Sequence, residues 1–296
     1  MKQVNRLLPL LLLIAAIPTV GQHRRVVFFH LEQAPYSALA SGINNHGEVA
    51  GTVGTEMGNR QGFVWANGRF REIFEYKTFP PPHIFDTHVY GINDRGDTVG
   101  SFASDVTVGN VTFVRDRHGH ATPLPPVNGT YPPSPLAIND AGTIVGSYAQ
   151  YAFILVGGHY TLLAYPGAET TTATGINRWG TVVGWYSTVS ASPEFNRFGF
   201  IYSNGHFQTT FQCVDGGVAQ YTEARAINDW GEIAGNCGTR MFVRDRFGTI
   251  TFVNLENVPT QPTLTGINNR GDLTGYSLAS PGLIDSFVMY GAAKRH

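Results

Sequence analysis

Charged side chains are scarce in this chain of 296 residues. Asp, Glu, Lys and Arg make up 14% of it, against about 25% in an average globular protein. The 20 basic and 21 acidic residues nearly cancel, so the chain lacks the basic footprint that suits nucleic acid or an anionic membrane. Hydrophobic residues still make up 42% and aromatic residues 12%, which excludes a disordered chain.

Apolar runs long enough to span a membrane are also absent. The longest run, 7–20, contains two prolines and is shorter than the roughly 20 residues that a transmembrane helix needs. Lys2 and Arg6 precede it and small residues follow, so residues 1–21 have the layout of a secretory signal peptide with cleavage before Gln22. No cysteine follows the run to carry a lipid. We therefore expect a secreted or periplasmic protein without a membrane anchor.

Sequence motifs that are typical of enzymes are missing as well. The sequence contains no Gly-x-Ser-x-Gly elbow, phosphate-binding loop, EF-hand loop or His-Glu-x-x-His. This absence favours a binding module over an enzyme, and we expect neither a cofactor nor a resident metal ion.

Glycine, in contrast, is abundant, with 35 residues, and much of it belongs to a repeat. One ten-residue pattern, [GA]-I-N-x-x-G-x-x-x-G, occurs six times, about 45 residues apart. The six copies occupy 42–51, 91–100, 137–146, 175–184, 226–235 and 266–275.

Local turn chemistry explains this pattern. Asn at the first turn position accepts hydrogen bonds from the following backbone, and the Gly three residues later adopts a positive φ. We therefore predict a hairpin tip in each copy and assign its Asn and Gly to the turn alone. These residues are Asn44, Asn93, Asn139, Asn177, Asn228 and Asn268, with Gly47, Gly96, Gly142, Gly180, Gly231 and Gly271.

Each hairpin is followed by a Phe-containing strand, a Gly turn and a returning strand, which makes four antiparallel strands per repeat. The sixth repeat lacks its fourth strand, and segment 25–32 is a strand without a repeat. Pairing 25–32 with 286–290 completes the set and leaves no open sheet edge. The prediction is an all-β, six-bladed β-propeller that forms a single domain over 22–296.

The repeat resembles the HAF-type extracellular repeat of exported, mostly bacterial proteins. The likeness rests on the ten-residue hairpins, on strands such as Ala152-Phe153, and on the PGAETTTATGIN segment at 166–177. It covers residues 25–291. It implies export and a β repeat fold, and it implies no catalytic residues.

Function is expected on the face formed by the loops before each first and each third strand. These loops vary in length and chemistry, as binding loops do, whereas the turns at the other face are short and uniform. Aromatic platforms beside polar groups suit sugar rings or peptide segments. The candidate ligand-binding residues are Tyr36, His83, Asp86, His88, Tyr131, Tyr165, Glu169, Asp215, Tyr221 and Glu223.

The expected partner is an extracellular polysaccharide or protein segment bound by a monomer. The alternative is a glycoside hydrolase or lyase that uses paired acids, such as Glu169 with Asp215 or Glu223. His83, Asp86 and His88 would offer only an incomplete metal site.

Only two cysteines are present, Cys213 and Cys237. The fourth strand of repeat four ends at Cys213 and the second strand of repeat five at Cys237, so both reach the same face in neighbouring blades. We predict a disulfide between them, as suits an exported protein; two separate buried thiols are the alternative.

Overall fold

The computed structural model describes residues 24–30, 38–54, 59–75, 84–104, 110–129, 132–189, 196–255, 262–280 and 283–291. The regular structure in these ranges consists of strands. No helix in the described part of the chain is long and apolar enough to cross a membrane. The expected signal peptide, 1–21, and the candidates Tyr36, His83 and Tyr131 lie outside the described residues.

The strands follow the predicted order of first, second, third and fourth strand in each repeat. The first strands are β2 (Ala38–Ile43), β6 (Ile84–Ile92), β10 (Ser134–Ile138), β14 (Thr170–Ile176), β20 (Thr222–Ile227) and β24 (Thr263–Ile267). The second strands are β3 (Val49–Gly54), β7 (Thr98–Ser104), β11 (Ile144–Tyr148), β15 (Val182–Ser187), β21 (Ile233–Cys237) and β25 (Leu273–Ser280).

The third strands carry the Phe, and the fourth strands return from the Gly turn. The third strands are β4 (Arg60–Ala66), β8 (Val111–Arg115), β12 (Tyr151–Val156), β16 (Arg197–Ser203), β22 (Arg240–Arg244) and β26 (Leu283–Met289). The fourth strands are β5 (Arg69–Phe74), β9 (Ala121–Pro123), β13 (His159–Leu163), β17 (His206–Phe211), β23 (Ile250–Val253) and β1 (Val26–Phe29). A short hairpin of β18 (Val214–Asp215) and β19 (Val218–Ala219) was not predicted.

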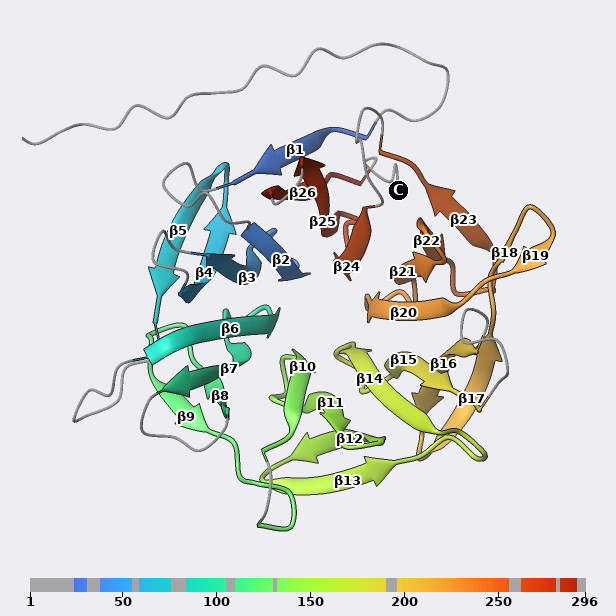
Figure 1. Ribbon diagram of the computed structural model, residues 1–296, viewed down its shortest axis with the longest axis horizontal. Coiled ribbons are helices and arrows are strands. Elements are labelled where there is room, and N and C mark those ends of the chain that lie inside the picture. Colours follow the sequence, from blue (N-terminus) through green and yellow to red (C-terminus); the bar gives the residue numbers. More distant parts are fainter. Residues whose placement is uncertain are drawn as a thin grey trace, which may run out of the picture.

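The sheets surround a common centre with the first strands innermost (Figure 1). Four sheets contain four strands each: β10 to β13, β14 to β17, β20 to β23, and β1-β26-β25-β24. One eight-stranded sheet holds β2 to β9, in which β4 and β6 are joined by a single parallel pair, Arg60 with Asp86. The sequence predicted separate four-stranded sheets, and this pair is where the structure differs. The arrangement is all-β and propeller-like.

Strands from the two ends of the described chain pair with each other. β1 runs antiparallel to β26, from Val26 opposite Met289 to Phe29 opposite Ser286. The pairing predicted for 25–32 with 286–290 is observed over this shorter stretch. Phe29 also stacks on Trp65 of β4, with ring centroids 4.5 Å apart, so β1 packs against the first repeat as well as pairing with the last.

The ten-residue repeat forms the predicted hairpin tips. In the first copy the N–H of Gly47 donates to the carbonyl of Asn44, and the N–H of Asn44 donates to Glu48. The six turn glycines have φ between +75° and +82°, a conformation that side chains with a Cβ rarely adopt. All six glycines thus lie in hairpin turns and adopt the positive φ that these turns require.

Each first strand also carries a β-bulge that the sequence did not reveal. The register with the second strand shifts by one residue, three positions before the turn Asn, in every repeat. A bulge bends the strand and redirects a side chain. The bulged residues are Ser41, Tyr90, Leu136, Thr174, Arg225 and Thr265.

The core of each repeat is a Phe ring packed over a Gly. The last Gly of the ten-residue pattern pairs with the Phe of the third strand, as Gly146 does with Phe153. All six of these Phe side chains are completely buried. A Cβ built on Gly146 would lie 1.9 Å from the carbonyl oxygen of Ser134 and 2.8 Å from the Phe153 ring, so the backbone there leaves room for glycine alone.

The predicted disulfide is present. Cys213 and Cys237 are bonded, with Cα atoms 5.9 Å apart, and both are buried. The bond links the chain after β17 to the end of β21, in the neighbouring sheet.

Replacing Gly146 by Ala should destabilise the protein by about 3 kcal/mol, because the added methyl group overlaps backbone that cannot retreat. Urea unfolding measures this loss. Gly158→Ala is the control: its Cβ meets no atom within 4 Å, so it should cost only the strain of a positive φ, about 1 kcal/mol. Equal losses in the two variants would contradict the packing argument.

Replacing Cys213 and Cys237 together by Ala should lower the free energy of unfolding by about 3 kcal/mol. The bond closes a loop of 24 residues, and without it the unfolded chain regains the conformational freedom of that loop. Thermal unfolding of the double variant beside the oxidised and the reduced parent protein provides the measurement. A double variant as stable as the oxidised protein would show that the bond contributes nothing.

Candidate functional site

The hairpin tips meet around the centre through the turn asparagines. We call Asn44, Asn93, Asn139, Asn177, Asn228 and Asn268 the Asn ring. The Nδ2 of each donates to the main-chain carbonyl of the ring Asn in the next repeat, at 3.0 to 3.3 Å, and Asn268 donates back to Asn44. Each side chain is only 2% to 6% exposed.

The Oδ1 of each ring Asn meanwhile accepts the N–H four residues on, within its own turn. These residues therefore have a second role beyond the turn, which the sequence did not reveal. Each amide makes the turn with its oxygen and joins the next repeat with its nitrogen.

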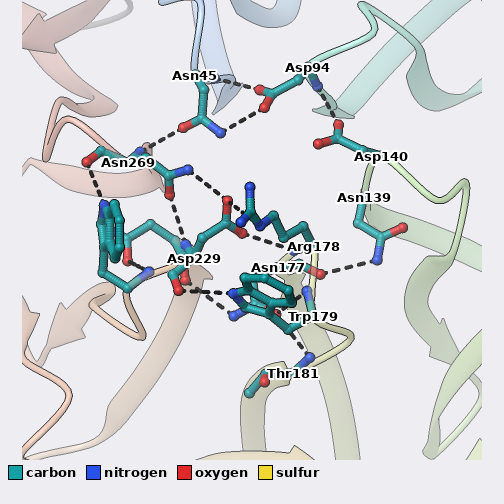
Figure 2. A network of polar contacts seen from close by, with 12 residues as sticks. Asn45, Asp94, Asn139, Asp140, Asn177, Arg178, Trp179, Thr181, Asp229 and Asn269 are labelled. Carbon is teal, nitrogen blue, oxygen red and sulfur yellow. Dashed lines mark hydrogen bonds and ion pairs between the residues drawn. The ribbon is translucent and has the colours of Figure 1, made fainter.

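A second circle of hydrogen bonds lies beside the Asn ring (Figure 2). In five of the six repeats, the N–H of the residue after the ring Asn donates to the side-chain oxygen of the corresponding residue in the next repeat. These residues are Asn45, Asp94, Asp140, Arg178, Asp229 and Asn269. The circle is broken between Asp140 and Arg178, because a guanidinium has no acceptor.

Burial raises the pKa of Asp140, and the like charges of Asp94 and Asp229 raise it further, against a backbone hydrogen bond from Asp94 that lowers it. Three carboxylates thus lie near one another at this end. Among the described residues, however, no group of three or more His, Cys, Asp or Glu is placed to hold a metal ion.

Two tryptophans on adjacent tips were missed by the sequence analysis. Trp179 and Trp230 are 66% and 55% exposed, yet each indole N–H donates to a carbonyl of the next tip, at Asp229 and Asn269. Arg270 makes the same kind of link to Asn45. The tip end of the molecule therefore uses many of its donors and acceptors to hold the repeats together.

The other end, where the first and third strands begin, presents two charged clusters. The first contains His88 of β6, whose Nε2 lies 3.5 Å from Nη1 of Arg60 on β4. The His88 ring stacks on Tyr90, with centroids 6.1 Å apart. Burial lowers the pKa of His88, the charge of Arg60 lowers it further, and Asp86 opposes them. The imidazole is therefore neutral at pH 7.

The second cluster is built around Glu223 of β20. This carboxylate is 7% exposed and pairs with two arginines, Arg197 through Oε1 and Arg225 through Oε2. Arg197 lies over the Trp185 ring, 4.4 Å from its centroid. The Nε of Arg225 is buried without a hydrogen-bond partner in the described part of the chain.

The structure thus places several candidate residues differently from the loops expected. Asp86, His88 and Glu223 belong to first strands, because β6 and β20 begin earlier than predicted. Tyr221 directly precedes β20, and Glu169 is exposed just before β14. Tyr165 stacks on Tyr186 at 3.8 Å, and Asp215 accepts a hydrogen bond of 2.6 Å from Arg240.

No family model matches the chain, and no curated protein matches its sequence. Among solved structures it is similar to a gluconolactonase from Xanthomonas campestris, at 13% identity over 90% of each chain with a TM-score of 0.54. It is similar to a streptogramin B lyase, at 14% identity over 89% of this chain and 97% of that one, with a TM-score of 0.51. AofleA from Arthrobotrys oligospora matches at 12% identity over 93% and 89%, with a TM-score of 0.50. At such identities these likenesses show the propeller-like fold alone.

Replacing Arg178 by Asn should stabilise the protein by about 1 kcal/mol, because an amide oxygen supplies the acceptor that the second circle lacks. The contacts it removes are weak ones of a half-exposed arginine: an ion pair of 3.7 Å with Asp229 and a cation–π contact with the exposed Trp179 ring. Thermal unfolding of Arg178→Asn against Arg69→Asn, an exposed position outside the circle, tests this. A variant less stable than the parent would contradict the role given to the gap.

Proposed function

We propose that the protein is an exported, six-bladed β-propeller that binds an extracellular polysaccharide at the end where the first and third strands begin. The observation that carries the proposal is the pair of charged clusters there, Arg60 with His88 and Arg197 with Glu223 and Arg225. Binding loops belong on a rigid scaffold, and the loops that vary in length open at this same end.

The six blades are supported by the eight-stranded sheet, whose two antiparallel halves are joined by only one residue pair and can be counted separately. The pairing of β1 with β26 supports a closed ring. The likeness to HAF-type repeats and the disulfide support a role outside the cell, where such bonds persist.

A polysaccharide suits the chemistry better than a protein segment. Trp185 and the stacked His88 and Tyr90 place flat rings beside guanidinium and carboxylate groups. Sugars use both kinds of group, the rings against their apolar faces and the polar groups for their hydroxyls.

The alternative of a glycoside hydrolase or lyase receives less support. Hydrolysis requires one carboxyl group that can give its proton to the leaving oxygen. Glu223 is engaged by two arginines and Asp215 by Arg240, so neither is free for that role.

A glycan array combined with a reducing-sugar assay tests the proposal. We expect binding to at least one polysaccharide without release of reducing ends. The bound polysaccharide should quench the tryptophan fluorescence of the protein, and this quenching should disappear in Trp185→Phe and persist in Trp230→Phe. Growth of reducing ends with time would favour the hydrolase or lyase instead. Binding to proteins with no response on the array would overturn the polysaccharide.

A further inference from the structure

Charge is unevenly distributed over equivalent register positions of the six repeats at the end where the first and third strands begin. We compare three positions per repeat, called the axial positions: five and three residues before the ring Asn, and three residues before the buried Phe. They are Leu39, His88, Ser134, Thr172, Glu223 and Thr263; Ser41, Tyr90, Leu136, Thr174, Arg225 and Thr265; and Arg60, Asn110, Gln150, Arg197, Thr239 and Ile284.

Formal charges at these positions come from only two places in the ring. Arg60 and the neutral His88 lie where the first repeat meets the second, and Arg197, Glu223 and Arg225 lie where the fourth meets the fifth. Arg60 and Arg197 occupy the same position of their third strands. Figure 1 shows β6 and β20 on opposite sides of the centre, so the two clusters oppose each other.

The balance of these positions is positive. Three arginines stand against one glutamate, a net charge of +2. Glu223 is shared by Arg197 and Arg225, so it cannot neutralise both. Arg60 pairs with Asp86 through the backbone of β4 and β6, but no ion pair joins its side chain to a carboxylate within the described residues; its guanidinium lies against the His88 ring.

These arginines remain open to solvent. The side chains of Arg197 and Arg225 are 42% and 35% exposed, and Arg60 is exposed too. Of the nearby carboxylates, Asp215 is held by Arg240. Asp86 lies two residues before His88, and Glu169 lies three residues before Thr172, so neither occupies an axial position.

Resting on the proposed function, we infer that the polysaccharide is anionic and that Arg60 and Arg197 bind its carboxylate or sulfate groups from opposite sides of the centre. Guanidinium forks match planar, charged oxygen pairs better than they match hydroxyls. The Nε of Arg225 is buried and has no hydrogen-bond partner among the described residues. The arginines of this cluster therefore have more hydrogen-bond donors than the Glu223 carboxylate can accept from. Glu223 acts as a positioning residue that fixes the two guanidinium groups of its cluster.

Calorimetry with four polymers tests this inference: polygalacturonate, its full methyl ester, dextran sulfate and plain dextran. We expect polygalacturonate or dextran sulfate to bind at least about tenfold more tightly than its uncharged counterpart, and the affinity to fall with salt. Binding of polygalacturonate alone assigns carboxylate, and binding of both charged polymers assigns any anionic group. Arg60→Gln and Arg197→Gln should each weaken binding about tenfold, whereas Arg246→Gln, exposed at a turn on the tip side, should not.

The outcomes separate the two claims. Equal affinity for the charged and uncharged polymers, or array binding to neutral glycans alone, overturns the anionic ligand and leaves a polysaccharide-binding protein. If the charged polymers bind and neither Arg60→Gln nor Arg197→Gln weakens that binding, the placement of the ligand between the two arginines is overturned. No binding to any polymer here or on the array overturns the proposed function as well. Far-ultraviolet circular dichroism confirms that each variant is folded.

Discussion

The Asn ring is the constraint on which the rest of the structure depends. Each ring amide has two tasks, because its oxygen closes the hairpin turn and its nitrogen binds the carbonyl of the next repeat. Asp would satisfy a turn equally well and could not donate. The exposed turns before β9 and β23 make this plain: Asp116 and Asp245 accept the same pair of backbone N–H groups there, where no neighbouring repeat has to be joined.

This division of tasks separates the two ends of the molecule. At the tip end the ring amides, the second circle and the Trp179, Trp230 and Arg270 links use polar groups to join repeats. Between the ends, each Phe packed over its Gly fills the sheets and lets the inner strands approach closely. The opposite end also joins neighbouring repeats, through the disulfide and the pair of Arg197 with Glu223, but its arginines keep donors exposed to solvent. These exposed donors are what support the binding proposed for that end.

The sequence predicted the features that follow from local chemistry repeated six times. The I-N-x-x-G tips, the strand order, the pairing of β1 with β26 and the bond between Cys213 and Cys237 all follow from turn propensity and position in the repeat. The β-bulges could not be predicted, since they depend on how strands twist in the assembled sheet. Nor could Arg60 and His88, 28 residues apart, be brought together before the packing of neighbouring repeats was known. One signal was available and missed: six Asn with no Asp, where a turn alone would accept either.

The most direct test of the central claim is the free energy of unfolding of Asn177→Asp. This substitution keeps the oxygen that accepts from Trp179 and Thr181 and removes the nitrogen that donates to Asn228. If the Asn ring holds the repeats together, the variant should lose about 3 kcal/mol, because a buried charge then faces a carbonyl without a donor. The matched reverse change, Asp245→Asn in the exposed turn, should have a much smaller effect. An Asn177→Asp protein as stable as the parent would contradict the account.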